Sequence, residues 1–314
     1  MSEKTYPLLL KPVVKDYLWG GKRLKDEFHF ETEKEIAAEG WMLAVHKDGT
    51  NTVVNGDLKG RTLDSVLSSW GYKDKFPILI KLIDAKDKLS VQVHPDNAYA
   101  LEKEGEYGKT EMWYIVDCKP GARLIYGFNR EISKAEFKER ITDNTLDEVM
   151  NYVPVNVGDV FFISAGTLHA IGEGILIAEI QQNSNTTYRV SDYGRLGVDG
   201  KPRELHVDKA LDVTVTKPSV IPYGKVGEPT EHDYGYSRHL AKCEYFDVTH
   251  YKLDGELPLA SKENFISLLV LDGNASVNYG SESIKVKKGD SVLIPKHFSV
   301  NVTGKAEIIC SLCE

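Results

Sequence analysis

The 314-residue chain has few cysteines and no long apolar run. Four cysteines are too few for a disulfide framework at this length. Cys310 and Cys313 have a spacing that also occurs in metal and redox sites, but we expect reduced thiols there. The N-terminus offers only residues 7–10 as an apolar run, which is too short for a signal sequence or a membrane span. We therefore expect a cytoplasmic protein that does not bind membranes.

Positive charge is also scarce, since 39 Lys and Arg stand against 47 Asp and Glu, giving a formal net charge of 39 − 47 = −8. A chain with this balance is not expected to bind nucleic acid through bulk attraction, although a local basic pocket could hold a small anion. The glycine-rich nucleotide-binding motifs and the Gly-x-Ser-x-Gly nucleophile motif are missing. Nucleotide-dependent and serine-hydrolase chemistry are therefore not expected.

Most of the secondary-structure patterns in the sequence are those of short β-strands. Residues 76–83, 89–93, 112–116, 160–163 and 175–180 are rich in β-branched and aromatic residues and are bounded by turn residues. Helical patterns are few and lie between the strands. They comprise residues 63–70 with a stop at Gly71, a short helix capped by Asp96, and a helix with a Ser133–Glu136 capping box that continues to Met150 with a break near Asp143 and Asn144.

A weak internal repeat organises the chain. Residues 158–164 match residues 289–295, each with a Gly-Asp turn before an apolar strand, and residues 114–118 match residues 269–273. Two copies of a small antiparallel unit predict a mainly β fold of two jelly-roll barrels, with a small helical insertion in the first. Residues 226–233 are polar and rich in turn formers, so we place the boundary there, between domains at residues 1–225 and 226–314.

The first copy carries a set of metal-ligating residue types. Ser90, Gln92 and His94 alternate along one predicted strand, so their side chains share a face. Glu111 follows 111 − 94 = 17 positions later at the head of a strand, and His169 follows the Gly158 turn by 169 − 158 = 11 residues. Two imidazoles, a carboxylate and an amide oxygen form a plausible divalent-metal site with room for water or substrate.

The second copy provides an internal control for this site. The positions that match the carboxylate and the second imidazole are Ile266 and Val300 there. The ligating residues are therefore not needed to close a barrel, and their restriction to the first copy favours a functional role.

Cationic residues accompany the predicted ligands. Lys109 lies two residues before Glu111 and shares its face if this stretch is extended, and Arg189 and Arg195 flank a polar segment downstream. In an acidic protein, such residues near a metal indicate an anionic substrate. The alternative is that all three are solvated surface charges.

Five stretches resemble one known family. They are DYLWGG at residues 16–21, SVQVHPD at 90–96, GKTEMWY at 108–114, AGTLHA at 165–170 and QNSNTTYR at 182–189. Together they are similar to the type I mannose-6-phosphate isomerases of the cupin superfamily, in particular to their compact bacterial branch. The likeness spans most of the first two-thirds of the chain.

This resemblance implies a zinc enzyme that interconverts mannose 6-phosphate and fructose 6-phosphate through an enediol. The residues implied are Gln92, His94, Glu111 and His169 as zinc ligands, Arg189 as the catalytic arginine, Ser90 and Lys109 as substrate contacts, Trp19 near the pocket, and Glu179 at an active-site position. Glu179 and Lys109 are the candidates for the general acid or base, with a zinc-bound water as a third. Some family members carry a histidine immediately before the lysine, a position that Gly108 holds here.

Two other functions fit parts of the pattern. A metal-dependent oxygenase on the same barrel would use two histidines and a carboxylate on iron, but Gln92 and the cationic residues disfavour it. A non-catalytic sugar-phosphate-binding cupin would keep the metal and Arg189 without moving a proton. We expect a phosphorylated hexose as the partner, a monomer or weak homo-oligomer, and a supporting role for the second barrel.

Overall fold

The computed structural model describes residues 4–197 and 200–313. Its contacts divide the chain into two compact units. Unit 1 combines the N-terminal residues through Lys15, Lys22–Leu82 and the chain from Val226, and unit 2 combines Asp16–Gly21 with Ile83–Lys225. The chain passes from unit 1 to unit 2 within strand β7 (Ile78–Ala85).

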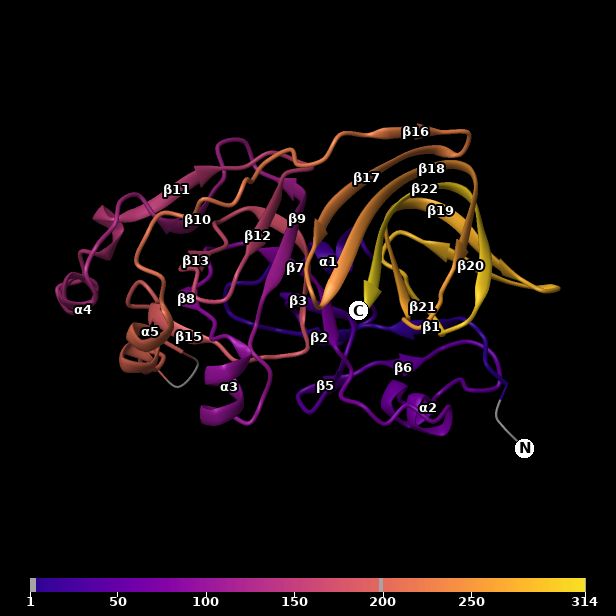
Figure 1. The fold of residues 1–314 in the computed structure, drawn as a ribbon, viewed down its shortest axis with the longest axis horizontal. Helices are drawn as coiled ribbons and strands as arrows, with labels where there is room; N and C mark the ends of the chain where they lie inside the picture. The colour runs from indigo at the N-terminus through magenta and orange to yellow at the C-terminus, as the bar shows by residue number, and fades with distance from the viewer. Residues whose placement is uncertain (1–3, 198–199, 314) are drawn as a thin grey trace. The chain divides into compact units, whose positions relative to one another are not determined.

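Unit 1 is built on an antiparallel sheet of nine strands within the described residues. Their order is β16-β17-β18-β22-β19-β21-β1-β6, with β20 paired to β19. In Figure 1 the long strands β17, β18, β22 and β19 curve side by side. The bounds are β1 (Leu8–Lys11), β6 (Thr52–Val53), β16 (Thr230–His232), β17 (Gly235–Lys242), β18 (Phe246–Ala260), β19 (Ile266–Tyr279), β20 (Glu282–Lys287), β21 (Ser291–Ile294) and β22 (Ser299–Cys313).

The N-terminal strand explains why unit 1 is discontinuous in sequence. Strand β1 pairs with β21 through Leu8 and Leu293, and on its other side with β6. The unit boundary at residues 225 and 226 lies where the polar segment begins, but much of the chain before residue 83 groups with the C-terminal sheet. Unit 1 also contains the β2–β3 pair, the β4–β5 hairpin and two helices. These are β2 (Val13–Lys15), β3 (Glu39–Leu43), β4 (Val45–His46), β5 (Gly49–Thr50), α1 (Arg23–Asp26) and α2 (Leu63–Ser69).

Unit 2 contains a five-stranded sheet, β11-β10-β13-β8-β15, and the antiparallel strands β12-β9-β14. One face of the five-stranded sheet is an apolar core, in which Val91 and Val93 pack with Phe137 of α4 and Ala210 of α5. The other face is left for polar side chains. The bounds are β8 (Val91–Val93), β9 (Glu111–Cys118), β10 (Arg123–Phe128), β11 (Met150–Pro154), β12 (Val160–Ile163), β13 (His169–Ala170), β14 (Ile175–Gln182), β15 (Tyr188–Ser191), α3 (Asn97–Lys103), α4 (Lys134–Thr142), the 3-10 helix η1 (Leu146–Glu148) and α5 (Val207–Val213).

The predicted helix caps are confirmed, but one helix is shorter than expected. The side chains of Asp96 and Ser133 accept hydrogen bonds from backbone N–H groups at the starts of α3 and α4. The expected continuation to Met150 is wrong, because α4 ends at Thr142 and Met150 begins strand β11. Asn144, which adopts a positive φ of 56°, marks the predicted break.

The internal repeat is confirmed by matching geometry in the two units. Gly158 and Gly289 have φ values of 85° and 88°, which a residue with a side chain could adopt only with strain. Asp159 and Asp290 each accept a hydrogen bond of 2.8 Å from the backbone N–H three residues earlier. The flanking strands keep the same register, since Glu111 is paired with Ile163 and its counterpart Ile266 with Ile294. The fold is therefore mainly β, and its assignment to two jelly-roll barrels stays a prediction.

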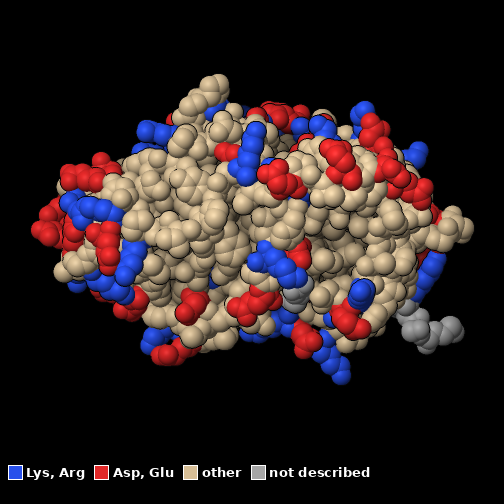
Figure 2. All heavy atoms as spheres, turned by 45° about the horizontal axis from the view of Figure 1, so that its top comes forward, with Lys and Arg blue, Asp and Glu red and all other residues tan. Residues whose placement is uncertain are grey.

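Charged side chains of both signs are interspersed on the face shown in Figure 2, where the Lys and Arg atoms drawn form no continuous surface. Among the helices that the structure describes, none combines the length and apolar character needed to cross a membrane. Cys310 and Cys313 are free thiols in strand β22, and burial raises the pKa of Cys310 to about 12.

Candidate active site

The polar face of the five-stranded sheet aligns three of the predicted residues. Gln92 of β8 lies opposite His169 of β13 on one side and opposite Arg189 of β15 on the other. Residues directly opposite in an antiparallel pair project to the same face, so the three side chains form a row. The predicted strand was too long, because β8 spans only Val91–Val93 and leaves the buried Ser90 and His94 just outside it.

His94, Glu111 and His169 converge to form a candidate metal site. Their ligand atoms all lie within 4.8 Å of one another, and all three residues are buried. Glu111 heads β9 as expected, with Oε2 3.6 Å from His94 Nε2 and Oε1 3.4 Å from His169 Nε2. One carboxylate and two imidazoles brought to one point are a donor set suited to a divalent metal ion.

Backbone carbonyls orient both imidazoles for this role. His94 Nδ1 lies 2.9 Å from the carbonyl oxygen of Thr186, and His169 Nδ1 lies 2.8 Å from that of Thr167. A carbonyl only accepts, so each Nδ1 donates its proton and each Nε2 is left with a lone pair. Burial, with a smaller contribution from Lys109, lowers the pKa of His169 to about 4. The ring is therefore neutral at pH 7, the form that binds a metal.

Gln92 is close enough to join this set. Its Nε2 lies 3.4 Å from His169 Nε2. A half-turn of the amide would bring Oε1 to that position, and only this oxygen can ligate a metal. The geometry of the residues thus fits the predicted four-residue ligand set, with Gln92 in the orientation that presents oxygen.

Lys109 and Glu179 stand next to the candidate metal ligands. Lys109 Nζ lies 2.8 Å from Glu111 Oε2, 3.3 Å from His94 Nε2 and 3.7 Å from Glu179 Oε1. Trp113 Nε1 donates a 2.9 Å hydrogen bond to Glu179 Oε2 and so orients that carboxylate. All of these side chains are buried, and a lysine and a glutamate with direct access to one another can pass a proton.

Arg189 lies among further cations. Its Nη1 donates a 2.9 Å hydrogen bond to the carbonyl oxygen of Glu204, while its buried Nε has no hydrogen-bond partner among the described residues. Burial, followed by the charge of Arg203, lowers the pKa of Arg189. Arg195 and Arg203 both donate to the carboxylate of Asp192. Arg195 also lies 3.8 Å from Asp87, so carboxylates offset part of the positive charge of these guanidinium groups.

Trp19 lies beside these arginines. Its ring stacks on Tyr17 with centroids 5.5 Å apart, and both rings line a cavity of about 340 Å³ with Asp192, Arg195 and Arg203. The described lining includes none of the predicted metal ligands. A position for Trp19 near the substrate remains a prediction.

Gly108 is held where a side chain has no room. A Cβ there would lie 2.4 Å from the carbonyl carbon of Asp96 and 2.5 Å from the backbone nitrogen of Asn97. The histidine that some family members carry at this position would require the backbone to move. In this conformation no imidazole can stand immediately before Lys109.

Three supporting residues carry no assigned role in the sequence patterns. Trp113 and Gln182 lie within the stretches that resemble the family, and Asn97 directly follows one of them. The partner of Trp113 lies 66 residues away and that of Asn97, on Gln182, 85 residues away. Polar residues at such separations carry no local signal of pairing.

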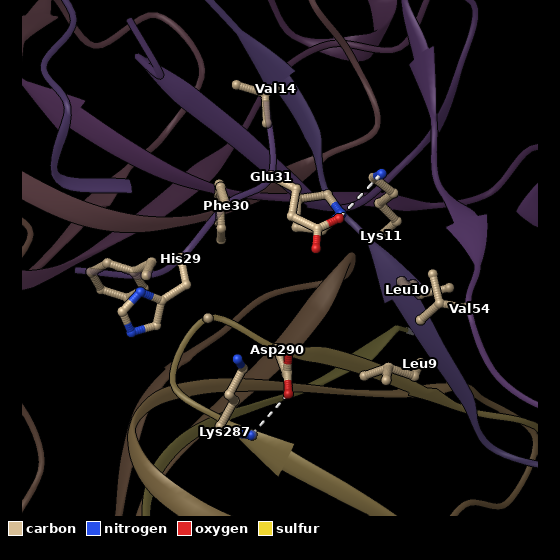
Figure 3. Close-up of a pocket in the computed structure, with 13 residues that line it drawn as sticks. Leu9, Leu10, Lys11, Val14, His29, Phe30, Glu31, Val54, Lys287 and Asp290 are labelled. Carbon is tan, nitrogen blue, oxygen red and sulfur yellow. Dashed lines mark hydrogen bonds and ion pairs between the residues drawn. The ribbon is translucent and has the colours of Figure 1, made fainter. Parts of the chain in front are cut away.

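A second cavity lies in unit 1 and contains none of the predicted site residues. It has a volume of about 280 Å³, between strand β1, residues 28–31 and the turn before β21. Figure 3 shows Glu31 and Lys11 pointing toward one another on its wall, with their charged atoms 3.7 Å apart.

The second copy of the repeat has no ligating residues at the positions that match Glu111 and His169. Ile266 and Val300, which occupy them, belong to the apolar core of unit 1.

Comparisons with known proteins agree with the sequence motifs. The family model of the catalytic domain of type I phosphomannose isomerases matches residues 8–124, and that of the cupin domain of mannose-6-phosphate isomerases matches residues 236–313. The chain is 37% identical over 314 residues to a mannose-6-phosphate isomerase of Streptococcus mutans, covering 97% of this chain and 98% of that protein. It is 39% identical over 315 residues to the mannose-6-phosphate isomerase ManA of Bacillus subtilis, covering 98% and 99%. A crystal structure of mannose 6-phosphate isomerase from Bacillus subtilis superposes with a TM-score of 0.88 at 36% identity, covering 97% and 99%.

Proposed function

Because the chain belongs to the type I mannose-6-phosphate isomerase family, we propose that it interconverts mannose 6-phosphate and fructose 6-phosphate with a bound zinc ion. The observation that carries this proposal is the convergence of His94, Glu111 and His169 in one buried cluster, with Lys109 in direct contact. A metal-ligating set and a proton-transferring group thus share one site.

The reaction moves a proton between C1 and C2 of the sugar. A bound zinc ion would supply Lewis-acid polarisation of the sugar oxygens at this site. Lys109 and Glu179 lie 3.7 Å apart, so one can release a proton as the other takes one up. Trp113 holds the Glu179 carboxylate by its 2.9 Å hydrogen bond and keeps it from turning away. We assign the general acid and base to this pair.

Arg189 provides positive charge on the same sheet face as Gln92 and His169. A guanidinium stabilises negative charge that develops on an enediolate or rests on a phosphate. We assign this role to Arg189, and substrate contacts to Ser90 and Lys109.

The test is the formation of fructose 6-phosphate from mannose 6-phosphate by the purified full-length chain. It is measured before chelation, after chelation and after zinc is restored, with Arg189→Ala in parallel. We expect activity that is lost with chelator, returns with zinc, and falls by about 10²-fold or more in the variant. A fully metal-loaded protein without isomerase activity would refute the proposal and favour a sugar-phosphate-binding cupin.

The wider assignments rest on the same proposal. We propose that residues 1–225 carry the catalytic cupin domain and that residues 226–314 form a degenerate cupin domain without ligands, in which Ile266 and Val300 fill an apolar core. A monomeric or weakly associating cytoplasmic enzyme remains the expectation. Size-exclusion chromatography with light scattering would test the oligomeric state.

A further inference from the structure

The segment that delivers Lys109 to the site lies outside the sheet ladder. Strand β9 begins at Glu111, and residues 108–110 have no regular secondary structure. Buried backbone N–H groups without a ladder partner need another acceptor. Here each of the three finds one, because Gly108 N–H donates to Asn97 Oδ1 at 2.9 Å, Lys109 N–H to the carbonyl of Pro95 at 3.0 Å, and Thr110 N–H to Gln182 Oε1 at 2.9 Å.

The two side chains that accept these bonds also hold each other. Gln182 Nε2 donates to Asn97 Oδ1 at 3.0 Å, so this oxygen receives both Gly108 N–H and the Gln182 amide. The backbone N–H of Gln182 also donates to the carbonyl of Thr110 at 3.0 Å. Asn97 is the first residue of α3 and Gln182 the last of β14, so a helix start and a strand end are joined across residues 108–110.

Gly108 makes this arrangement possible. The backbone of Asp96 and Asn97 approaches so closely that a Cβ at position 108 would lie 2.4 to 2.5 Å from it. Glycine therefore lets the segment lie against the start of α3, within reach of the Asn97 side chain. The Lys109 side chain leaves from the middle of this segment and meets Glu111, His94 and Glu179.

We propose that Asn97 and Gln182 act as positioning residues, a polar clamp that fixes residues 108–110 and so holds the Lys109 ammonium against Glu179 and Glu111. The catalytic part of this proposal rests on the proposed isomerase function, in which Lys109 transfers a proton. A displacement of about 1 Å of a catalytic group can cost about 10²-fold in rate. We expect the clamp to act on turnover while the protein still holds a full complement of zinc, because none of the predicted ligands lies within residues 108–110.

The test compares four zinc-loaded full-length proteins: wild type, Asn97→Leu, Asn97→Asp and Tyr99→Phe. Asn97→Leu removes the acceptor and keeps a side chain that branches at Cγ, and Asn97→Asp keeps an oxygen in its place. Tyr99→Phe is the matched control, because it lies on the same helix and loses a 2.8 Å hydrogen bond to Asp212 that does not involve the clamp. Should Asn97→Leu not fold, Asn97→Ala takes its place.

We expect Asn97→Leu to lower kcat by about 10- to 100-fold with KM nearly unchanged and a full complement of zinc. Asn97→Asp should recover most of the loss, and Tyr99→Phe should match wild type. Amide hydrogen exchange gives a readout that needs no turnover: the N–H groups of Gly108 and Thr110 should exchange about tenfold faster in Asn97→Leu alone.

Undiminished kcat in Asn97→Leu would overturn the clamp, as would a loss of kcat accompanied by loss of zinc, which is what a merely structural role predicts. An equal loss of kcat in Asn97→Asp and Asn97→Leu would also overturn the clamp. A wild-type protein that does not isomerise the sugar would refute the proposed function and the catalytic part of the clamp together. The exchange rates separate that failure from the failure of the clamp itself.

Discussion

Removing the charge of Lys109 should tighten metal binding while it lowers turnover. The Lys109 ammonium lies 2.8 Å from Glu111 Oε2 and 3.3 Å from His94 Nε2, two of the predicted ligand atoms. A metal ion that binds there must displace the ammonium or lie beside a like charge. In Lys109→Met both penalties disappear, and so does a candidate proton carrier.

The expected change in metal affinity follows from the charges of the ammonium and of the metal ion. Two unit charges about 4 Å apart interact by about 4 kcal/mol at an effective dielectric constant of about 20, and the double charge of a divalent ion makes this about 8 kcal/mol. If side-chain rearrangement leaves about a quarter of this, removal of the ammonium is worth about 2 kcal/mol, or about 30-fold in metal affinity. Loss of a positioned proton-transfer group lowers kcat by about 10²- to 10⁴-fold.

The assay is a competition for zinc between the apoprotein and a chelating dye at pH 7, with kcat measured on the metal-loaded protein. Lys119→Met is the matched control, because Lys119 is exposed and lies 3.5 Å from the equally exposed Glu173. It should change neither quantity. Unchanged or weaker zinc binding in Lys109→Met would show that the ammonium does not compete with the metal and would refute the reasoning.

Three further variants test individual contacts. Trp113→Phe removes the 2.9 Å hydrogen bond to Glu179 and should lower kcat by about 10-fold or more while zinc content stays full. Ser133→Ala removes the acceptor for the first turn of α4 and should lower the free energy of unfolding by about 1 kcal/mol in urea. Burial acts to raise the pKa of Asp192, but hydrogen bonds from Arg203 and then Arg195 hold it below its ordinary value. The stability that Asp192 contributes is therefore present above the unfolded pKa of about 4 and is lost as the pH falls through the folded pKa. Asp192→Asn should then be less stable than wild type at pH 7, and the difference should shrink toward pH 3; a constant difference would contradict this.

Local features of the fold could be predicted because their causes lie within a few residues. Ser133 caps α4 through the N–H of Glu136, three positions later. The turn at Gly158 depends on a glycine with positive φ and on the adjacent Asp159, and the same pair recurs at Gly289. The residue types of the candidate metal site could also be read, because imidazole and carboxylate are donor types that divalent metals prefer.

Features that depend on distant partners could not be predicted. Strand β1 pairs with β21, so Leu8 lies opposite Leu293, and only this pairing places the N-terminal segment in unit 1. Met150 fits a helical spacing from Leu146, four residues earlier, but pairs with Phe128 in a strand, where tertiary contacts override the local pattern. The contact between Asn97 and Gln182 likewise depends on how α3 is laid against the end of β14.

The repeat also allows the polar cluster around Glu111 to be compared with the apolar residues at the equivalent place in unit 1. Glu111 and Ile266 occupy the same place in strands of the same register, so the β unit accommodates either. A buried carboxylate is costly unless charge and hydrogen bonds compensate it, and beside Glu111 the compensating charge is the Lys109 ammonium at 2.8 Å. Around Ile266 the neighbours are apolar, and a glutamate there would be buried without a cation. Because apolar residues already close the sheet in unit 1, stability does not require a polar cluster at the equivalent place in unit 2. This supports the proposed role of that cluster in binding metal and substrate.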